Sequence, residues 1–528
     1  MADGKPASPF APLAVRAFAL LWTATLVSNI GTWMHDVSAA WLMTSLSPSP
    51  LVVALVQAAT TAAMALFALP AGALADLFDR RRLLMGLVVF KAALAFVLGL
   101  LTISGLVDAW SLLLVTFLLG VGSALMAPVW QSIVPSLVPR TDLKAAVALN
   151  SLGINIARAI GPAVGGLLIV TAGVASAFFL NALSELVVLA ALLIWRPAAA
   201  PPQRTSPEGF LSAMAAGLRY AAHAPALKIV LVRAAAFFLF ASAFWALVPL
   251  VVRVSLGGDA SLYGLVVGAV GVGAVAGALA LPHADRRWGP DRLVQLGSLG
   301  TAGVLVVLAL VPVHAVAIGA GFVAGIAWIS VLSSLNVAAQ AALPDWVRGR
   351  GLSIYGLVFF GAMTIGAIVW GLAAQAFGVS VALVAAAAGL AGGIPLLTSH
   401  KLGATAEDLT PAGHWPDPTL AVSVLPDDGP VLVTIAYRVA PEKAEAFMAA
   451  VRRLSDARRR DGAYQWQLVQ DMADPTLFTE AFWVASWGEH ERQHARLTKA
   501  DAALQAMVSA FHTGPDAPVV RHAITRAG

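Results

Sequence analysis

The stretch 72-GALADLFDRRR-82 places five charged residues within seven positions, between two long apolar runs. The runs before and after it, 51–75 and 83–105, are each as long as the roughly 20 residues that an α-helix needs to cross a hydrocarbon core of about 30 Å. We therefore expect the charges in a short loop that joins two membrane helices. The composition agrees, because 59% of the 528 residues are hydrophobic and only 12% are charged, whereas soluble domains carry about 25% charged residues.

Apolar runs of this length recur along the chain and predict twelve membrane helices. They are 17–42, 51–75, 83–105, 110–134, 145–171, 174–195, 227–251, 262–282, 293–312, 316–339, 351–375 and 380–398. The first is longer than the core of an export signal and no small-residue cleavage site follows it, so we expect it to remain as a membrane helix. The chain has no cysteine, which excludes disulfides and thiolate chemistry.

The basic residues of the loops lie almost entirely on one side of these spans. Arg80, Arg81 and Arg82 are among them, whereas the loops of the opposite side hold only Arg253. Basic residues in short loops are retained in the cytoplasm. We therefore expect both termini in the cytoplasm, and we interpret the net charge of +5 as an orienting excess and not as a nucleic-acid surface.

An internal repeat joins the two halves of the membrane part. The stretch 72–75, Gly-Ala-Leu-Ala, recurs at 277–280, and in both places it closes an apolar run before a basic turn. The same offset pairs Gly120 with Gly325, Gln131 with Asn336, Pro139 with Pro344, Gly161 with Gly366 and Gly166 with Gly371. A shared offset favours two six-helix bundles of the same orientation, which is a transporter architecture with the substrate near the midplane.

The remainder of the chain is a small domain with a different pattern. Alternating and helical periodicities follow the order βαββαβ, which is typical of a ferredoxin-like unit. The fold class is thus an all-α membrane protein with twelve transmembrane helices in two parallel six-helix repeats, plus a small C-terminal α+β ferredoxin-like domain. The predicted domains are the first bundle 1–195, a cytoplasmic linker 196–226, the second bundle 227–398, a linker 399–430 and the cytoplasmic ferredoxin-like domain 431–528.

The charged loop resembles the signature of the major facilitator superfamily of transporters, Gly-x-x-x-Asp-Arg-x-Gly-Arg-Arg after the second helix. Four positions match it, namely Gly72, Asp76, Arg80 and Arg81. Leu77 and Asp79 stand where the family usually has Arg and Gly. The resemblance extends over about residues 10–400 and implies that this loop latches the two halves in one conformation.

A second likeness lies in the fifth predicted helix, 150-NSLGINIARAIGPAVGG-166. Its Gly161, Pro162, Gly165 and Gly166 resemble the end of a motif of drug and metabolite antiporters. Glycine lets helices approach and proline bends them, which suits a moving interface, although close packing without motion would use the same residues. Together with 33-WMHDVSAAWLMTSL-46, the pattern is most similar to the enterobactin-exporter-like branch, which implies export across a bacterial inner membrane.

Polar side chains inside the predicted helices are the candidate transport residues, because a charge at the centre of a membrane helix costs at least about 2.5 kcal/mol. They are Asn29, Trp33, Asp36, Gln131, Asn155, Arg158, Glu185 and Asn336. Two readings stay open for Arg158 and Glu185: a structural ion pair, or a substrate anchor beside an acid that titrates as protons cross. Asn29, Trp33 and Asp36 share one helix face, which the resemblance places at the cavity, although Asp36 also suits a hydrated mouth.

The C-terminal domain contains 490-HERQH-494, which matches the H-E-x-x-H zinc motif. A catalytic zinc site normally takes three protein ligands, and no third ligand follows at the expected spacing. We therefore predict no metal, no cofactor and no catalytic residue, and expect an exposed or weakly metal-binding helix face. The domain also resembles the dimeric α/β-barrel domains of antibiotic-biosynthesis monooxygenases, so a ligand pocket and a homodimer through this domain stay open.

These patterns predict a transporter and not an enzyme: a secondary exporter of small organic molecules such as drugs, siderophores or secondary metabolites. No G-x-x-x-x-G-K-[ST] phosphate loop occurs, so we expect alternating access driven by proton antiport. The expected partners are a small-molecule substrate, protons and the lipid bilayer. The alternative is a membrane-tethered ligand sensor or a cofactor-free monooxygenase-like enzyme that acts through the C-terminal domain.

Overall fold

The computed structural model describes residues 10–195, 210–398, 401–402, 408–412 and 422–525. The chain divides into two compact units. The first consists of the segments 1–205, 231–336 and 355–401, and the second consists of the segments 206–230, 337–354 and 402–528. Two earlier segments therefore group with the C-terminal domain, whose predicted boundaries stay a prediction.

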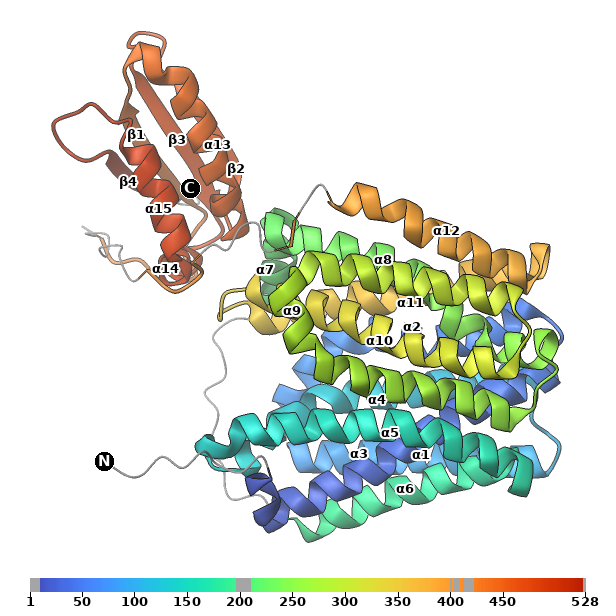
Figure 1. Cartoon of the computed structure of the whole chain (residues 1–528). Helices are drawn as coiled ribbons and strands as arrows, with labels where there is room; N and C mark the ends of the chain where they lie inside the picture. The colour runs from blue at the N-terminus through green and yellow to red at the C-terminus, as the bar shows by residue number, and fades with distance from the viewer. Residues whose placement is uncertain (1–9, 196–209, 399–400, 403–407, 413–421, 526–528) are drawn as a thin grey trace. The chain divides into compact units, whose positions relative to one another are not determined.

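Six helices form where the first six apolar runs predict them (Figure 1). They are α1 Arg16–Leu46, α2 Pro50–Leu77, α3 Arg80–Ile103, α4 Ala109–Leu137, α5 Leu143–Ala172 and α6 Val174–Ile194. Side chains also fix where helices start. Asp108 precedes α4 and accepts a hydrogen bond from the Ser111 backbone N–H at 2.9 Å, while the Ser111 hydroxyl accepts one from the Asp108 N–H. This capping box satisfies backbone donors that the first turn of a helix leaves unpaired.

The later helices differ from the prediction in two places. They are α7 Phe210–His223, α8 Pro225–Leu250, α9 Ala260–Leu310, α10 His314–Ala341, α11 Arg348–Phe377 and α12 Val379–Thr398. The helix α7 lies in the segment 196–226 that was predicted to be only a linker. The predicted spans 262–282 and 293–312 both lie in the 51-residue α9, which leaves helical geometry at Gly289, with φ 72° and ψ 167°. A positive φ suits glycine, and Pro290 follows it.

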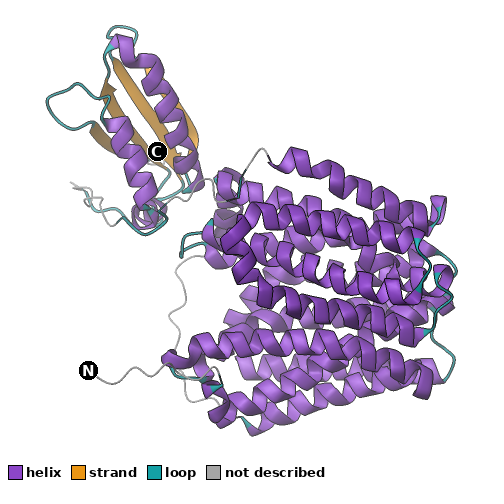
Figure 2. Ribbon diagram, viewed as in Figure 1, coloured by secondary structure: helices purple, strands orange, loops and turns teal. Residues whose placement is uncertain are grey.

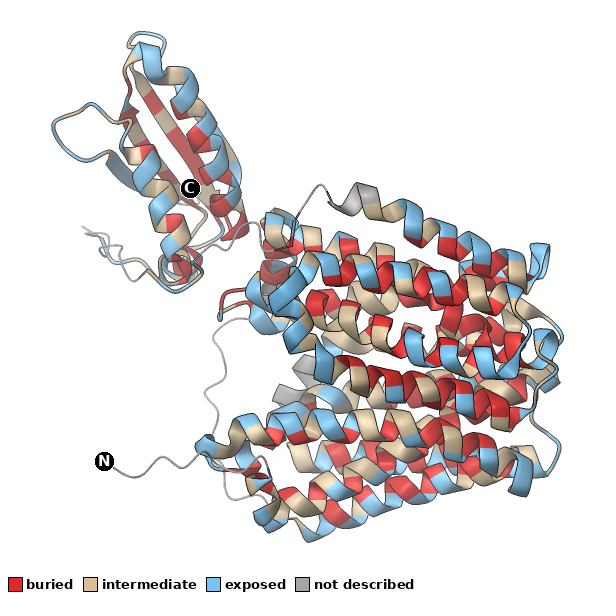
Figure 3. Cartoon of the chain, viewed as in Figure 1, coloured by how far each residue is buried: buried red, intermediate tan, exposed pale blue. Residues whose placement is uncertain are grey.

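Ten helices of the described residues are long and apolar enough to cross a membrane. The difference from twelve arises because α9 holds two predicted spans and because the apolar part of α12 is short, Val379–Ile394. Large apolar side chains are exposed on faces of these helices, for example Leu167, Leu183 and Ile194. Figure 3 shows exposed positions along many of the helices. A water-soluble protein rarely exposes so much apolar surface, so these faces are suited to lipid.

The repeat inferred from the sequence has a counterpart in the packing of its glycines. A Cβ on Gly161 of α5 would lie 2.5 Å from Trp33 Cβ of α1. Its repeat partner is Gly366 of α11, and a Cβ there would lie as close to the Leu239 carbonyl of α8. A Cβ on Gly166 would lie 2.5 Å from the Ala260 carbonyl oxygen of α9. A Cβ on its repeat partner Gly371 would likewise come too close to α2. Paired glycines thus sit at paired helix crossings.

The C-terminal domain is a four-stranded antiparallel sheet with helices on one face (Figure 2). Its elements are β1 Val431–Arg438, α13 Ala444–Arg460, β2 Tyr464–Gln470, β3 Leu477–Val484, α14 Trp487–Arg496, α15 Lys499–Ser509 and β4 Val519–Ile524, and the strand order is β2-β3-β1-β4. The strands form where they were predicted. The second helix of the predicted order βαββαβ is two helices, α14 and α15, because Thr498 and Asp501 form a capping box that starts α15.

The segments that group with the C-terminal domain are joined to it by arginine side chains. Arg219 of α7 pairs with Glu489 at 3.2 Å. Arg496 of α14 lies over the ring of Trp346, with its guanidinium carbon 4.4 Å from the ring centroid. Trp346 belongs to the turn between α10 and α11, so this domain, α7 and that turn form one compact unit.

Candidate functional site

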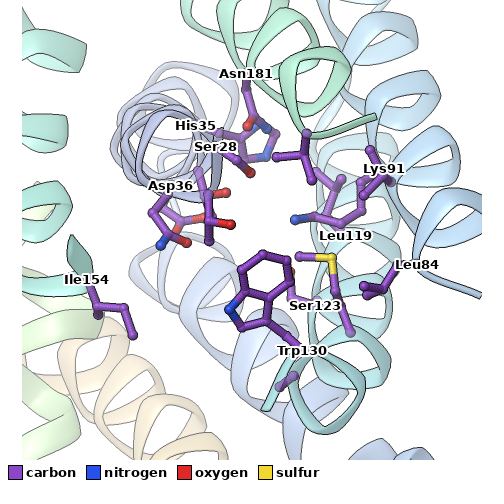
Figure 4. A pocket seen from close by; sticks show the side chains of 18 of the residues that line it. Ser28, His35, Asp36, Leu84, Lys91, Leu119, Ser123, Trp130, Ile154 and Asn181 are labelled. Carbon is purple, nitrogen blue, oxygen red and sulfur yellow. The ribbon is translucent and has the colours of Figure 1, made fainter. Parts of the chain in front are cut away.

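A cavity of about 370 Å³ lies among α1 to α6 (Figure 4). The apolar part of its lining includes Leu84, Leu119 and Trp130. The polar part of the lining consists of hydroxyl, amide and titratable side chains, namely Thr25, Ser28, Asn29, Thr32, His35, Asp36, Thr60, Lys91, Thr116, Ser123, Asn150 and Asn181. A mostly apolar cavity with a few convergent polar groups is the usual form of a small-molecule site.

A buried ion pair lies beside this cavity and was not predicted. Lys91 Nζ of α3 lies 2.6 Å from Glu185 Oε1 of α6, and the two side chains are 5% and 0% exposed. Ser28 of α1 donates a further hydrogen bond to the same oxygen at 3.1 Å. The ion pair between Arg158 and Glu185, one of the two alternatives left open for these residues, is therefore not formed. Helices α3 and α6 pack side by side, so the acid finds its cation there and not on α5.

Polar atoms without a partner gather at the same place. Among the described residues, both ring nitrogens of His35, Glu185 Oε2 and the side-chain oxygen of Asn181 are buried without a hydrogen bond. The His35 ring packs on Phe178 with centroids 4.9 Å apart. A buried polar atom that makes no hydrogen bond costs about 1–3 kcal/mol, so this region is not optimised for stability alone. Sequence analysis missed His35, although its place beside Asp36 in an apolar helix is a visible signal.

Arg158 and Trp33 meet where the first six helices contact the later ones. The Arg158 guanidinium carbon lies 5.6 Å from the centroid of the Trp33 ring, and the Trp33 ring lies 6.4 Å from that of Trp245 on α8. All three side chains are half-buried. The three residues predicted to share one face therefore have different surroundings. Asn29 and Asp36 line the cavity, whereas Trp33 faces α5 and α8.

The remaining predicted path residues lie apart from the cavity. Gln131 is exposed on α4 and Asn336 is half-buried near the end of α10. The Asn155 amide donates to the Ser151 carbonyl at 2.9 Å, a contact within its own helix. A joint role for Gln131 and Asn336 stays a prediction.

The charged loop shows a local role for two of its residues. Asp79 accepts a hydrogen bond from the Arg82 backbone N–H at 2.8 Å and thereby caps α3. The Arg81 guanidinium donates from Nε to the Leu192 carbonyl at 2.8 Å and from Nη2 to the Leu193 carbonyl at 3.1 Å. These carbonyls end α6, where a cation is favoured by the helix dipole.

Among the other motif positions, Arg80 has a described contact. Arg80 donates to the Ser132 carbonyl of α4 at 3.4 Å. Gly72 and Asp76 lie in the last turns of α2, but their side-chain surroundings fall outside the described part of the chain. Their latch role stays a prediction.

The small-residue motif of α5 lies at two helix contacts. Gly165 approaches Met34 of α1, and a Cβ at this position would lie 3.0 Å from the Met34 Cα. Gly166 approaches Gly264 of α9, which in turn lies close to the Pro162 carbonyl. Since no side chain intervenes, the two backbones approach closely at this point.

The helix face of the zinc-like motif is exposed only in part, because Glu491 is exposed and His494 is half-buried whereas His490 is buried. His490 is 1% exposed, and its ring lies 4.6 Å from that of His494 and 4.7 Å from that of His522 on β4. Glu491 accepts a hydrogen bond from Trp487 Nε1 at 2.9 Å, a contact within its own helix. Within the described residues, no three His, Asp or Glu side chains are arranged to hold a metal ion.

We predict that acid destabilises this domain through His490. Burial and, to a smaller degree, the facing imidazoles of His494 and His522 together lower the pKa of His490 to about 3. As the pH falls from 6.5, the unfolded chain binds a proton that the folded domain does not bind, so stability is lost on acidification, by about 2 kcal/mol at pH 5. Urea titration of the full chain, read through the thiol of Val508→Cys in α15, measures this loss. His490→Leu should flatten the pH dependence and the exposed His283→Leu should leave it unchanged.

The structure defines a multi-pass membrane protein, by its long apolar helices and their apolar outer faces. The chain belongs to the transmembrane secretion effector family, within the major facilitator superfamily of transporters, since the family model matches residues 7–528. The match includes the C-terminal domain. Nothing in it supports the separate likeness of that domain to monooxygenase barrels, which stays a prediction.

The chain is similar in sequence to two curated proteins and in fold to two solved structures. The chain is 25% identical over 376 residues to the multidrug efflux pump Tap of Mycolicibacterium fortuitum, covering 69% of this chain and 91% of Tap. It is 27% identical to the enterobactin exporter EntS of Shigella flexneri, covering 63% of this chain and 79% of EntS. The nucleoside transporter NupG has a similar fold, with a TM-score of 0.62 and 11% identity, and the match covers 72% of this chain and 99% of NupG. An inward-facing bacterial homolog of the human lysosomal transporter Spinster is also similar, with a TM-score of 0.58 and 17% identity, and the match covers 75% of this chain and 98% of that homolog.

Proposed function

We propose that this protein exports small organic molecules such as drugs, siderophores or secondary metabolites across the bacterial inner membrane. The observation that carries this proposal is the match of almost the whole chain to a family of secretion transporters. Relatives named for drug efflux and for siderophore export support it. The cavity and the half-buried Trp33, Arg158 and Trp245 give the chain groups that suit organic substrates.

We further propose twelve spans that work as two six-helix bundles rocking about a central path. The equivalent packing of Gly161 with Gly366, and of Gly166 with Gly371, supports this pseudo-symmetry. Hydrogen bonds between the two bundles gather at the end of the molecule opposite the charged loop, for example from the Ser49 hydroxyl to Gln375 at 2.9 Å. We take this end to be external, so the conformation is closed outward and ready to load from the cytoplasm.

Proton antiport is the coupling that we propose, with Asp36 and Glu185 as the acids in the path. Asp36 lines the cavity, and Glu185 lies beside it in contact with Lys91 and Ser28. An ionisable side chain inside the membrane part is retained at a cost in stability, which favours a functional role. A homodimer through the open face of the C-terminal sheet is a separate proposal that this role does not require.

The test of export compares inverted membrane vesicles with and without the full chain. A panel of drugs and metabolites is offered under an imposed pH gradient, and uptake that depends on both the chain and the gradient supports proton-driven export. Asp36→Asn and Glu185→Gln should each lose the gradient dependence. Chain-dependent uptake of no panel member would contradict export, whereas removal of residues 401–528 should leave uptake intact and would abolish a tail-borne enzyme activity.

Thiol labelling tests the proposed orientation, because the native chain has no cysteine. Phe78→Cys next to the charged loop and Leu106→Cys at the other end of α3 replace side chains that are 57% and 72% exposed. A membrane-impermeant maleimide added to intact cells should label Leu106→Cys and spare Phe78→Cys until the membrane is opened. The reverse pattern would invert the topology and turn export into uptake.

A further inference from the structure

Arg158 is a cation in a membrane helix that no acidic side chain of the described residues neutralises. Its buried Nε makes no hydrogen bond, and its contact is the Trp33 ring, 5.6 Å from the guanidinium carbon to the ring centroid. A cation–π contact compensates a buried charge only weakly, and a charge inside the membrane part normally has an ionic or polar partner. Glu185, the one acid predicted for it, pairs with Lys91 instead. The guanidinium is therefore available to a partner from outside the chain.

The surroundings of Arg158 are aromatic and come from both bundles. The Trp33 ring faces Trp245 on α8 at 6.4 Å, Trp245 packs on Trp328 of α10 at 5.6 Å, and Trp328 packs on Phe359 of α11 at 6.4 Å. We call Trp33, Trp245, Trp328 and Phe359 the aromatic cluster. Trp33 and Trp245 are only half-buried, so part of each ring can contact a ligand.

A second arginine, Arg253, also lies over a tryptophan ring, but its surroundings differ from those of Arg158. Arg253 lies over Trp41, 5.3 Å from its guanidinium carbon to the ring centroid. It is exposed, and its Nη1 donates to the hydroxyls of Thr44 at 2.8 Å and Ser45 at 2.6 Å. Arg253 thus has water and two acceptors, whereas Arg158 has an aromatic face and a buried nitrogen without an acceptor.

We propose that Arg158 and the aromatic cluster form the substrate site and that this site takes planar aromatic anions. A carboxylate or phenolate can bind the planar guanidinium through charge-assisted hydrogen bonds, and the attached ring can stack on the tryptophans. This inference rests on the proposed export function and names its substrate class. Since the cluster joins α1 to α8, a ligand bound there contacts both bundles.

Binding of three small probes tests the substrate class without any transport step. The full chain in phosphatidylcholine nanodiscs is titrated by calorimetry with 2-naphthoate, with the aromatic cation 2-naphthylmethylammonium and with the aliphatic anion cyclohexanecarboxylate. We expect 2-naphthoate to bind at least about tenfold more tightly than the other two, since a hydrogen bond to a charged group contributes about 1.5–3 kcal/mol. Equal or tighter binding of the cation would overturn the proposal.

Variants assign the binding to the residues. Arg158→Gln and Trp245→Leu should each weaken 2-naphthoate, Arg158→Lys should retain part of the affinity, and the matched control Arg253→Gln should bind as the native chain does. If Arg158→Gln does not fold, the binding of 2-naphthoate by Arg158→Lys and by Trp245→Leu tests the site instead. Unchanged binding by folded Arg158→Gln, or binding of no probe by a chain that exports another molecule, would refute the aromatic-anion site and leave export standing. Binding through Arg158 by a chain that moves nothing in vesicles would refute export and leave the site standing.

Discussion

Lys91→Met is expected to lower the free energy of unfolding by about 3–5 kcal/mol, as is typical when one partner of a buried ion pair is removed. Methionine keeps the length of the side chain but not its charge, so the Glu185 carboxylate stays buried with Ser28 as its remaining donor at 3.1 Å. Glu185→Leu should cost a similar amount, because it leaves the Lys91 ammonium 5% exposed without its counter-ion. Unfolding of the full chain in mixed micelles measures both.

The double variant separates a structural role from the cost of burying charge. Lys91→Met combined with Glu185→Leu should recover most of the lost stability, because neither charge is then left alone. The control is Arg348→Met, which breaks a surface pair with Asp345 whose side chains are 49% and 78% exposed, and it should change stability by less than about 1 kcal/mol. A double variant as unstable as the two single variants combined would show that the two residues do not act as a pair.

Most helices and strands could be predicted because hydrophobic length and periodicity are local properties of the sequence. The runs 51–75 and 83–105 became α2 and α3 almost residue for residue. The helix α7 and the break after α14 were missed for a local reason too. The first lies in the segment 196–226 that was predicted to be a linker. The second depends on the capping box of Thr498 and Asp501, which divides the second predicted helix of the domain.

The site was predictable in its residue types but not in its pairings. Asp36 and Glu185 were identified because an acid in a membrane helix is rare. Which cation approaches Glu185 depends on how α3 and α6 pack, and no sequence spacing encodes this. Trp245 was missed for the same reason, since one tryptophan in an apolar helix is unremarkable until α8 packs it against Trp33.

Gly166→Leu is expected to abolish transport by separating α5 from α9 at the end of these helices that we propose to be external. Even a Cβ at this position would lie 2.5 Å from the Ala260 carbonyl oxygen and 2.9 Å from the Gly264 Cα, so a leucine must push α5 away from α9. Overpacking of this kind costs about 1–3 kcal/mol, which changes the ratio of two conformations by a factor of about 5 to 150. The matched control is Gly86→Leu on α3, because a Cβ there would meet nothing within 4 Å.

Accessibility of a thiol distinguishes this effect from simple misfolding. Asn29→Cys lines the cavity and should react slowly with an impermeant maleimide from outside, quickly when combined with Gly166→Leu and slowly again with Gly86→Leu. The mate Gly371→Leu wedges α11 against Leu51 and Ala54 of α2 and should have the same effect, because two bundles that rock about a pseudo-symmetric axis close at both crossings together. If Gly371→Leu left the thiol protected while Gly166→Leu exposed it, the two crossings would not be equivalent and the rocking of paired bundles would be refuted.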